Sequence, residues 1–342
     1  MVAESEVRPT PFAPGTSDTV AHEPMRIAAF GSTMVGGRMK SAVVRFPGQT
    51  VTATIWADQM YVQYMLPAER KHPCPIVLVH GGGCTGKAFE ERPDGAEGWV
   101  NFFVRRGFDT YWVDKPWRGR SGFDPTAINQ AVAEGDPGLI PEIHSPAPLE
   151  LLTSEQGAFT YGRLPRDVMI EGLKQIVPDF TPALHGARDV THGGPVIENA
   201  LIALLEKTGP AVLLGHSQGG GEVFGLLRSR PDLVAGLIAV EPAAPPTADF
   251  EKYARAPLLN VWAEHRPAIE GAHMSNASEA AVLTDKVNAA GGDAALIVLS
   301  DLGITGNGHM MMQNTNSDDV ARLLAEWIES HVRPVRPGLP RQ

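Results

Sequence analysis

The sequence is poor in cysteine, with only Cys74 and Cys84 among 342 residues. Neither residue lies in a CxxC or Cys–His spacing, so neither a disulfide framework nor a zinc site is indicated. The two cysteines flank a strand-like run, and the narrow geometry of disulfides disfavours a bridge across it.

The sequence also lacks clusters of positive charge and long apolar runs. Its net charge is −10, and no basic stripe is interleaved with aromatic residues, which argues against a nucleic-acid partner. An anionic membrane surface is disfavoured for the same reason. No window approaches about 18 consecutive apolar residues, so no membrane-spanning segment is expected. The first residues lack the basic start and apolar stretch of a secretory signal. The cytoplasm is therefore the default location, and a secreted or periplasmic one applies if a signal has been removed.

The sequence does contain alternating strand and helix patterns. Short apolar runs predict strands at 41–46, 50–56, 60–67, 74–80, 109–116, 211–217, 234–243, 257–265 and 294–301. Amphipathic patterns predict helices at 98–107, 165–177, 195–209, 279–292 and 317–332. This alternation favours an α/β fold, with a mostly parallel sheet of about eight strands that carries helices on both faces.

One stretch interrupts the alternation and sets the expected domain organisation. Residues 122–192 are irregular and rich in proline and glycine, which in a compact domain is typical of a lid or binding element. We expect 1–25 to be an extended lead. The core is expected to comprise 26–121 and 193–335, with 122–192 as a helical cap inserted into it.

The first candidate site residue is Ser217, in the stretch AVLLGHSQGGGEVFGLL at 211–227. A G-x-S-x-G pattern between a strand and a helix is typical of a sharp turn that exposes a nucleophilic serine, and Gly215 and Gly219 stand where side chains would clash. The N–H of Gln218, at the start of the helix, is then a donor for an oxyanion. The alternative is an ordinary tight turn that holds a small residue.

A second oxyanion donor is expected in VHGGGCTG at 79–86. Three glycines after a strand leave backbone N–H groups uncovered, and we assign the donor to Gly82, with Gly83 next. We expect His80 to brace this loop. A plain loop is one alternative, and a phosphate-binding turn is another. The second lacks the required Lys–Ser/Thr pair, because Lys87 is followed by alanine.

The base and the acid complete the candidate set. Among eleven histidines, only His309 lies on a glycine-rich loop between the last strand and the last helix. His331, in the last helix, and His265, after another strand, are less well placed. Glu241 and Glu264 each follow a strand between the serine and the histidine, and position along the chain favours Glu264 as the acid.

The motifs HGGGCTG, ERPDGAEGW, RGRSG, GHSQGG, VEPA, AAGG and GNGHMMMQ together resemble the α/β-hydrolase superfamily. More narrowly, they resemble a small group of bacterial esterases with a Ser–Glu–His triad. This resemblance implies Glu241 as the acid, a helical cap after the fourth core strand, and a possible homodimer. Relatives can carry adjacent, bridged cysteines in the oxyanion loop, where this sequence has Gly82 and Gly83.

The expected function is cleavage of a small-molecule carboxylic ester through an acyl-enzyme, without a metal or organic cofactor. A lactone, a carbamate or an amide is the nearest alternative substrate, and a non-catalytic binding protein is a further alternative. Trp117, Phe159, Tyr161 and the methionines at 310–312 are candidates to line the substrate pocket. For the methionines, packing in the core is an equal alternative.

Overall fold

The computed structural model describes residues 24–140, 143, 160–178, 194–264 and 276–333. Its strands are β1 (Ile27–Phe46), β2 (Gln49–Pro67), β3 (Ile76–Val79), β4 (Thr110–Asp114), β5 (Ala211–His216), β6 (Val234–Val240), β7 (Leu258–Trp262) and β8 (Ala294–Val298). Its helices are α1 (Lys87–Glu90), α2 (Trp99–Arg106), α3 (Thr126–Glu134), α5 (Arg166–Leu173), α7 (Gly194–Thr208), α8 (Gln218–Ser229), α9 (Ala277–Ala289) and α10 (Ser317–His331).

The strands form one sheet in the order β1-β2-β4-β3-β5-β6-β7-β8. β1 pairs with β2 and β2 with β4 in antiparallel fashion, and all the pairs from β4 through β8 are parallel. The expected mostly parallel, eight-stranded sheet is thereby confirmed. The carboxyl ends of the parallel strands meet at one edge, which is where ligands bind in open α/β sheets.

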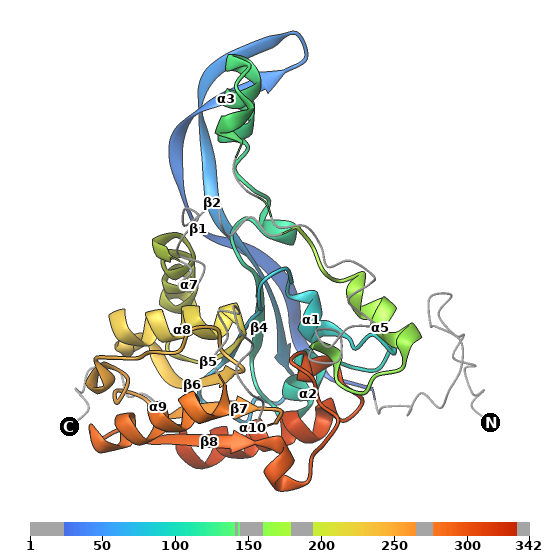
Figure 1. Ribbon diagram of the computed structural model, residues 1–342, viewed down its shortest axis with the longest axis vertical. Helices are drawn as coiled ribbons and strands as arrows, with labels where there is room; N and C mark the ends of the chain where they lie inside the picture. Colours follow the sequence, from blue (N-terminus) through green and yellow to red (C-terminus); the bar gives the residue numbers. More distant parts are fainter. Residues whose placement is uncertain (1–23, 141–142, 144–159, 179–193, 265–275, 334–342) are drawn as a thin grey trace.

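Side chains of the central strands alternate between two apolar layers. Ile76 and Leu78 of β3 belong to the layer that also contains residues of α2 and α10. Val77 and Val79 belong to the layer that contains residues of α7, α8 and α9. Because both faces are covered, the central strands are apolar throughout, as expected of parallel strands in an α/β protein. Figure 1 shows these helices packed around the strands.

The β1–β2 hairpin differs from the sequence expectation of three short strands. β1 spans 20 residues and β2 spans 19, so the runs at 50–56 and 60–67 are parts of one strand. The hairpin bends where Gly36, Gly37 and Asp58, opposite one another in the two strands, adopt positive φ angles. Because of this bend, the sequence pattern predicted two strands where the structure has one. Gly36 also admits the backbone of α7, since a β-carbon there would lie 2.9 Å from Cα of Ala200. Beyond the bend, the hairpin extends away from the sheet (Figure 1).

Parts of the segment 122–192 are described, namely 122–140, 143 and 160–178. Helix α3 packs beside β1 near the end of the hairpin (Figure 1), and the Asn129 side-chain amide donates to the Val43 carbonyl at 3.0 Å. Helix α5 contributes Leu173 to the apolar layer that also contains residues of α2. The boundaries of the cap remain a prediction.

Candidate active site

Ser217 occupies a strained turn between β5 and α8. Its φ of 54° and ψ of −119° lie in a region that is rarely occupied by residues other than glycine. The turn is held by backbone hydrogen bonds. The Ser217 N–H donates to the Val240 carbonyl at 2.9 Å, and the Ser217 carbonyl accepts from the Ala243 N–H at 2.8 Å. The surrounding structure therefore stabilises a conformation that presents the hydroxyl at the carboxyl edge of the sheet.

The glycines on either side of Ser217 permit this turn. A β-carbon on Gly215 would lie 2.7 Å from the Gly219 carbonyl carbon, and one on Gly219 would lie 2.6 Å from the His80 carbonyl oxygen. Such separations are well inside van der Waals contact, so larger residues would force the strand, the helix and the neighbouring loop apart.

His309 and Glu241 form a buried hydrogen-bonded pair. The His309 Nδ1 lies 2.7 Å from Oε2 of Glu241, and the other carboxylate oxygen accepts from the Ala263 N–H at 2.9 Å. Glu241 is only 1% exposed. With Nδ1–H donating to the carboxylate, Nε2 of the neutral imidazole is left as the acceptor, which is the arrangement that a general base requires.

His216, the residue before the serine, contacts the loop that carries His309. Its Nε2–H donates to the His309 carbonyl oxygen at 3.0 Å, and the two imidazole rings lie 4.5 Å apart. Burial, together with the nearby His309, holds the pKa of His216 well below its usual range, so this ring is neutral. The turn at Ser217 and the loop of His309 are thus joined by a hydrogen bond from the His216 side chain to the His309 backbone.

The glycine loop lies beside Ser217. A β-carbon on Gly81 would lie 3.0 Å from Cβ of Ser217. Gly82 follows as an exposed residue, and the Gly83 carbonyl accepts from the Val177 N–H at 2.7 Å. The glycine loop thus approaches Ser217 at Gly81, and Gly82 is the next residue along the chain.

His80 has the bracing role expected from the sequence. It is fully buried, its Nδ1–H donates to the Gly81 carbonyl at 2.8 Å, and its Nε2 accepts from the Lys115 backbone N–H at 3.1 Å. Burial lowers the pKa of His80 well below its usual range, and the positive charge of Lys115 acts in the same direction.

Lys115 is a buried residue of this region that the sequence patterns did not reveal. It directly follows β4, and its ammonium contacts Gln218 and Glu222 of α8. A lysine immediately after an apolar strand, at the edge where the site forms, was the available signal. Asn314 was missed as well. Its side-chain amide donates to the Tyr161 carbonyl at 2.8 Å, and its Oδ1 accepts from the Gly308 N–H at 2.9 Å.

Of the candidate pocket residues, those that are buried pack in the core. The methionines at 310–312 and Tyr161 are buried in the apolar core, so packing is their role in this structure. The Trp117 indole N–H donates to Oδ1 of Asp58 at 3.0 Å. Phe159 lies outside the described residues.

The remaining candidates are Glu264, His265 and His331, together with the two cysteines. Glu264 follows β7 and is partly buried, and His265 falls in a range that the structure does not describe. His331 lies at the end of α10 and contacts Trp327 of the same helix. Cys74 and Cys84 are both buried.

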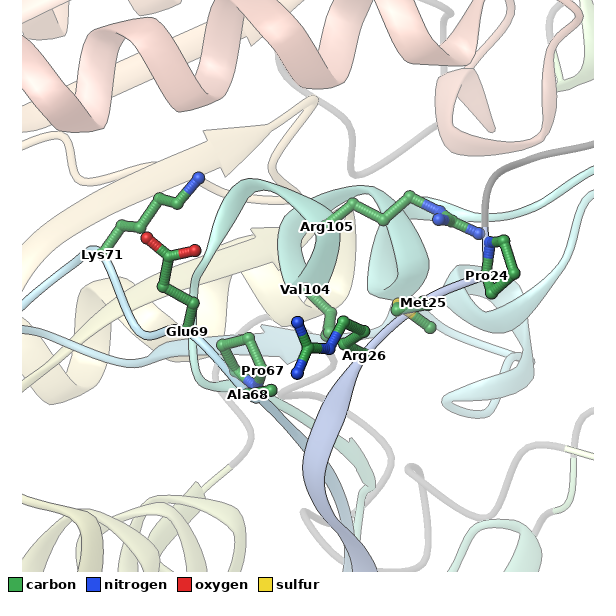
Figure 2. A pocket seen from close by; sticks show the side chains of 9 residues that line it. All are labelled: Pro24, Met25, Arg26, Pro67, Ala68, Glu69, Lys71, Val104 and Arg105. Atoms are coloured by element: carbon green, nitrogen blue, oxygen red, sulfur yellow. The ribbon is translucent and has the colours of Figure 1, made fainter.

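A cavity of about 310 Å³ lies at the other edge of the sheet, where β1 begins and β2 ends (Figure 2). It is lined by Pro24, Met25, Arg26, Pro67, Ala68, Glu69, Lys71, Val104 and Arg105. None of these residues is a serine, cysteine or histidine, and the cavity is separate from the carboxyl edge that carries Ser217. It therefore contributes nothing to the chemistry at that edge.

The described part of the chain contains no group of three or more histidine, cysteine or acidic residues arranged to hold a metal ion. Among the helices described, none combines the length and the apolar character needed to cross a bilayer.

The sheet order, the serine turn and the His309–Glu241 pair together define a hydrolase-type α/β fold, and comparison with known proteins agrees. No protein-family model matches the chain. The structure of a bacterial esterase superimposes with a TM-score of 0.80 at 31% sequence identity, covering 94% of this chain and 100% of the esterase. The probable secreted lipase phiG of Fungal sp. (strain ATCC 74256) is 27% identical over 330 residues, which cover 79% of this chain and 85% of the lipase.

The chain belongs to the α/β-hydrolase superfamily, and its relatives are of the esterase type. Because an esterase and a lipase both hydrolyse esters, the comparisons support ester hydrolysis at a general level.

Proposed function

We propose that this protein is a serine carboxylesterase-type hydrolase that cleaves a small-molecule ester through an acyl-enzyme. The observation that carries the proposal is the buried pair of His309 and Glu241, linked through His216 to the strained turn at Ser217. A strained nucleophile beside an oriented imidazole is the arrangement that acyl transfer requires.

In the first half of the proposed reaction, Ser217 Oγ attacks the ester carbonyl carbon while Nε2 of His309 accepts the hydroxyl proton. Glu241 stabilises the imidazolium through Nδ1–H. The N–H groups of Gly82 and Gln218 donate to the carbonyl oxygen as it becomes an oxyanion, and each such donor is typically worth about 3 kcal/mol in the transition state. His309 then protonates the departing alcohol oxygen, which leaves an acyl group on Ser217.

In the second half, His309 removes a proton from a water molecule that attacks the acyl carbonyl carbon. The same two N–H groups stabilise the second oxyanion. As the intermediate collapses, the proton passes to Ser217 Oγ, and the carboxylic acid is released. Every proposed step uses the chain's own side chains and backbone.

The test of this proposal is covalent labelling of Ser217 by a fluorophosphonate, followed by peptide mapping. We expect stoichiometric labelling with parallel loss of activity on p-nitrophenyl acetate, and no labelling of Ser217→Ala. A folded wild-type protein that stays unlabelled and inactive would instead support a non-catalytic binding protein.

The substrate class is a separate question from the mechanism. Lactones, carbamates and amides could react through the same three residues, because His309 can protonate an amine leaving group as well as an alkoxide. We propose esters first, because the relatives are an esterase and a lipase. Comparing kcat/KM for an ester, a lactone and an anilide with the same acyl group tests this order.

The compartment follows the relatives in the same way. The fungal relative is named as a secreted lipase, which supports the exported alternative over the cytoplasmic one. Fractionation of the native host with an antibody against the chain tests this alternative.

A further inference from the structure

Lys115 is a fully buried cation beside the nucleophile turn. It follows β4 directly, and its side chain is 0% exposed. Burial lowers the pKa of Lys115, and the attraction of Glu222 opposes that shift. Because an ammonium group loses its hydration when buried, a protein retains one only where close partners compensate.

The partners of Lys115 lie on the two segments that carry the proposed oxyanion donors. Its Nζ donates to Oε1 of Gln218 at 2.7 Å and contacts Oε1 of Glu222 at 3.0 Å, one turn further along α8. Its backbone N–H donates to His80, which precedes the glycine loop. One residue therefore connects the glycine loop to the start of the nucleophile helix.

This connection restrains the peptide group between Ser217 and Gln218. The backbone at Ser217 is strained, and strain of this kind persists only where the surroundings enforce it. Gln218 is 8% exposed, and its side chain is held at its far end by the ammonium. Fixing that side chain restricts rotation of its own backbone, including the N–H that is proposed to bind the oxyanion.

We propose that Lys115 is a positioning residue for the oxyanion hole. Through Gln218 on one side and His80 on the other, it keeps the two backbone donors at the separation that the transition state requires. The proposal rests on the proposed function, because it takes Gly82 and Gln218 as the donors. Lys115 itself touches no substrate.

The proposal and a purely structural role for the Lys115–Glu222 ion pair predict different effects of substitution. A structural pair affects stability alone, whereas a positioning residue affects kcat. The double variant Lys115→Met/Glu222→Met removes both charges of the pair and leaves the net charge of the buried cluster unchanged, with Arg118 as its remaining cation. We expect it to fold, with KM for p-nitrophenyl acetate within threefold of wild type and kcat lower by about 10- to 100-fold, somewhat less than for complete loss of a donor.

A second variant approaches the same contact from the other side. Gln218→Met keeps the backbone N–H but removes the acceptor of the Lys115 ammonium. We expect a similar fall in kcat, and no further fall when it is combined with the double variant, because residues that act through one contact are not additive. Lys252→Met, at an exposed ion pair far along the chain, is the matched control and should retain wild-type kinetics.

The decisive readout is affinity for a trifluoromethyl ketone, which forms a tetrahedral adduct with an oxyanion. We expect its inhibition constant to rise by the same factor as kcat/KM falls. If the double variant and Gln218→Met both fold and keep kcat and inhibitor affinity within twofold of wild type, the proposal is overturned. Fluorophosphonate labelling of wild-type Ser217 separates this failure from failure of the proposed function, since labelling does not depend on Lys115.

Discussion

Gly162, in the part of the chain between β4 and α7, crosses Gly308 of the histidine loop in direct backbone contact. A β-carbon on Gly162 would lie 2.6 Å from the Gly308 amide nitrogen. Hydrogen bonds flank the crossing, from the Arg163 N–H to the Gly306 carbonyl at 3.0 Å and from the Met310 N–H to the Thr160 carbonyl at 2.8 Å. This part of the chain, at 160–163, therefore holds the loop of His309 from outside.

Gly162→Ala should displace this loop. The new methyl group would collide with backbone, and φ at this position is +62°, so the two segments must separate. Displacement of a catalytic group by about 1 Å can cost on the order of a hundredfold, and we expect kcat to fall by about 10- to 100-fold. Steady-state kinetics with p-nitrophenyl acetate measure the effect.

The matched control for this substitution is Gly225→Ala in α8. A β-carbon there meets nothing within 4 Å, and φ is not positive. Alanine is favoured over glycine within a helix by about 1 kcal/mol, so this variant should be as active as wild type and at least as stable. Equal activity of the two variants would contradict the role given to the crossing.

Glu241→Gln should impair catalysis far more than Glu264→Gln. Glu241 is hydrogen-bonded to Nδ1 of His309, and an amide can neither hold the imidazole in the same way nor stabilise its charge. We expect kcat at neutral pH to fall by about a thousandfold or more for Glu241→Gln and by less than tenfold for Glu264→Gln. If Glu264→Gln were instead the more impaired variant, Glu264, which follows β7, would be the acid.

Folding stability should decrease as the pH falls below neutrality. Burial lowers the pKa values of His80 and His216 in the folded state, whereas in the unfolded chain they return to about 6.5. Below that pH, the unfolded state binds more protons than the folded state, so acid favours unfolding. Each histidine contributes a slope of up to about 1.4 kcal/mol per pH unit.

The two histidines together should therefore cost roughly 2–3 kcal/mol between pH 7.5 and 5.5. Urea unfolding at a series of pH values measures this change. His216→Asn, which removes one of the two titrating groups, should show a shallower slope over the same range. A stability that is constant or rises on acidification would be inconsistent with two buried neutral imidazoles.

The activity should be insensitive to thiol reagents and to reductants. Burial raises the pKa of Cys84 to about 11, so only about one thiol in a thousand is ionised at pH 8. We expect no reaction of native protein with Ellman's reagent on the time scale of an assay, and two reactive thiols after denaturation. Inactivation by dithiothreitol would show that the glycine loop depends on a disulfide after all.

The homodimer remains a prediction from the family resemblance. Large apolar side chains are exposed along the hairpin, among them Met39 at 71%, Trp56 at 57% and Phe46 at 54%, and such exposure is typical of surfaces that contact a partner. Light scattering after size exclusion should give about twice the chain mass of 36.6 kDa. A single-chain mass at micromolar concentration would rule out a stable dimer.

The sequence predicted those parts of the site that depend on local chain geometry. Gly215 and Gly219 around Ser217 signal a turn through sterics alone, and the apolar β5 run before them identifies the strand. The choice of Glu241 over Glu264 could not be made from chain position. It depends on a positive φ of 41° at Glu241 and on the hydrogen bond from the Ala263 N–H. Only the family resemblance indicated it.

Long-range contacts could not be predicted from the sequence, for a different reason. Lys115 meets Gln218 and Glu222 across about a hundred residues of chain, and Gly162 meets Gly308 across still more. Neither pairing leaves a periodic or compositional trace. The bend in the hairpin at Asp58 was missed because a single non-glycine residue with positive φ is not visible in an apolar pattern. The sequence therefore predicts elements and turns better than the contacts between them.

Ser217 and Glu241 are joined through one pair of neighbouring strands, β5 and β6. The Ser217 N–H donates to the carbonyl of Val240, the residue just before Glu241, so these two groups keep their spacing as long as β5 and β6 stay paired. His309 instead lies on a loop. This loop is held in place by the hydrogen bond from His216 and by the backbone contact with Gly162. Gentle heating should therefore inactivate the enzyme before the sheet melts. Substitutions that stabilise the loop of His309 should therefore raise the temperature at which activity is lost more than substitutions in the apolar core.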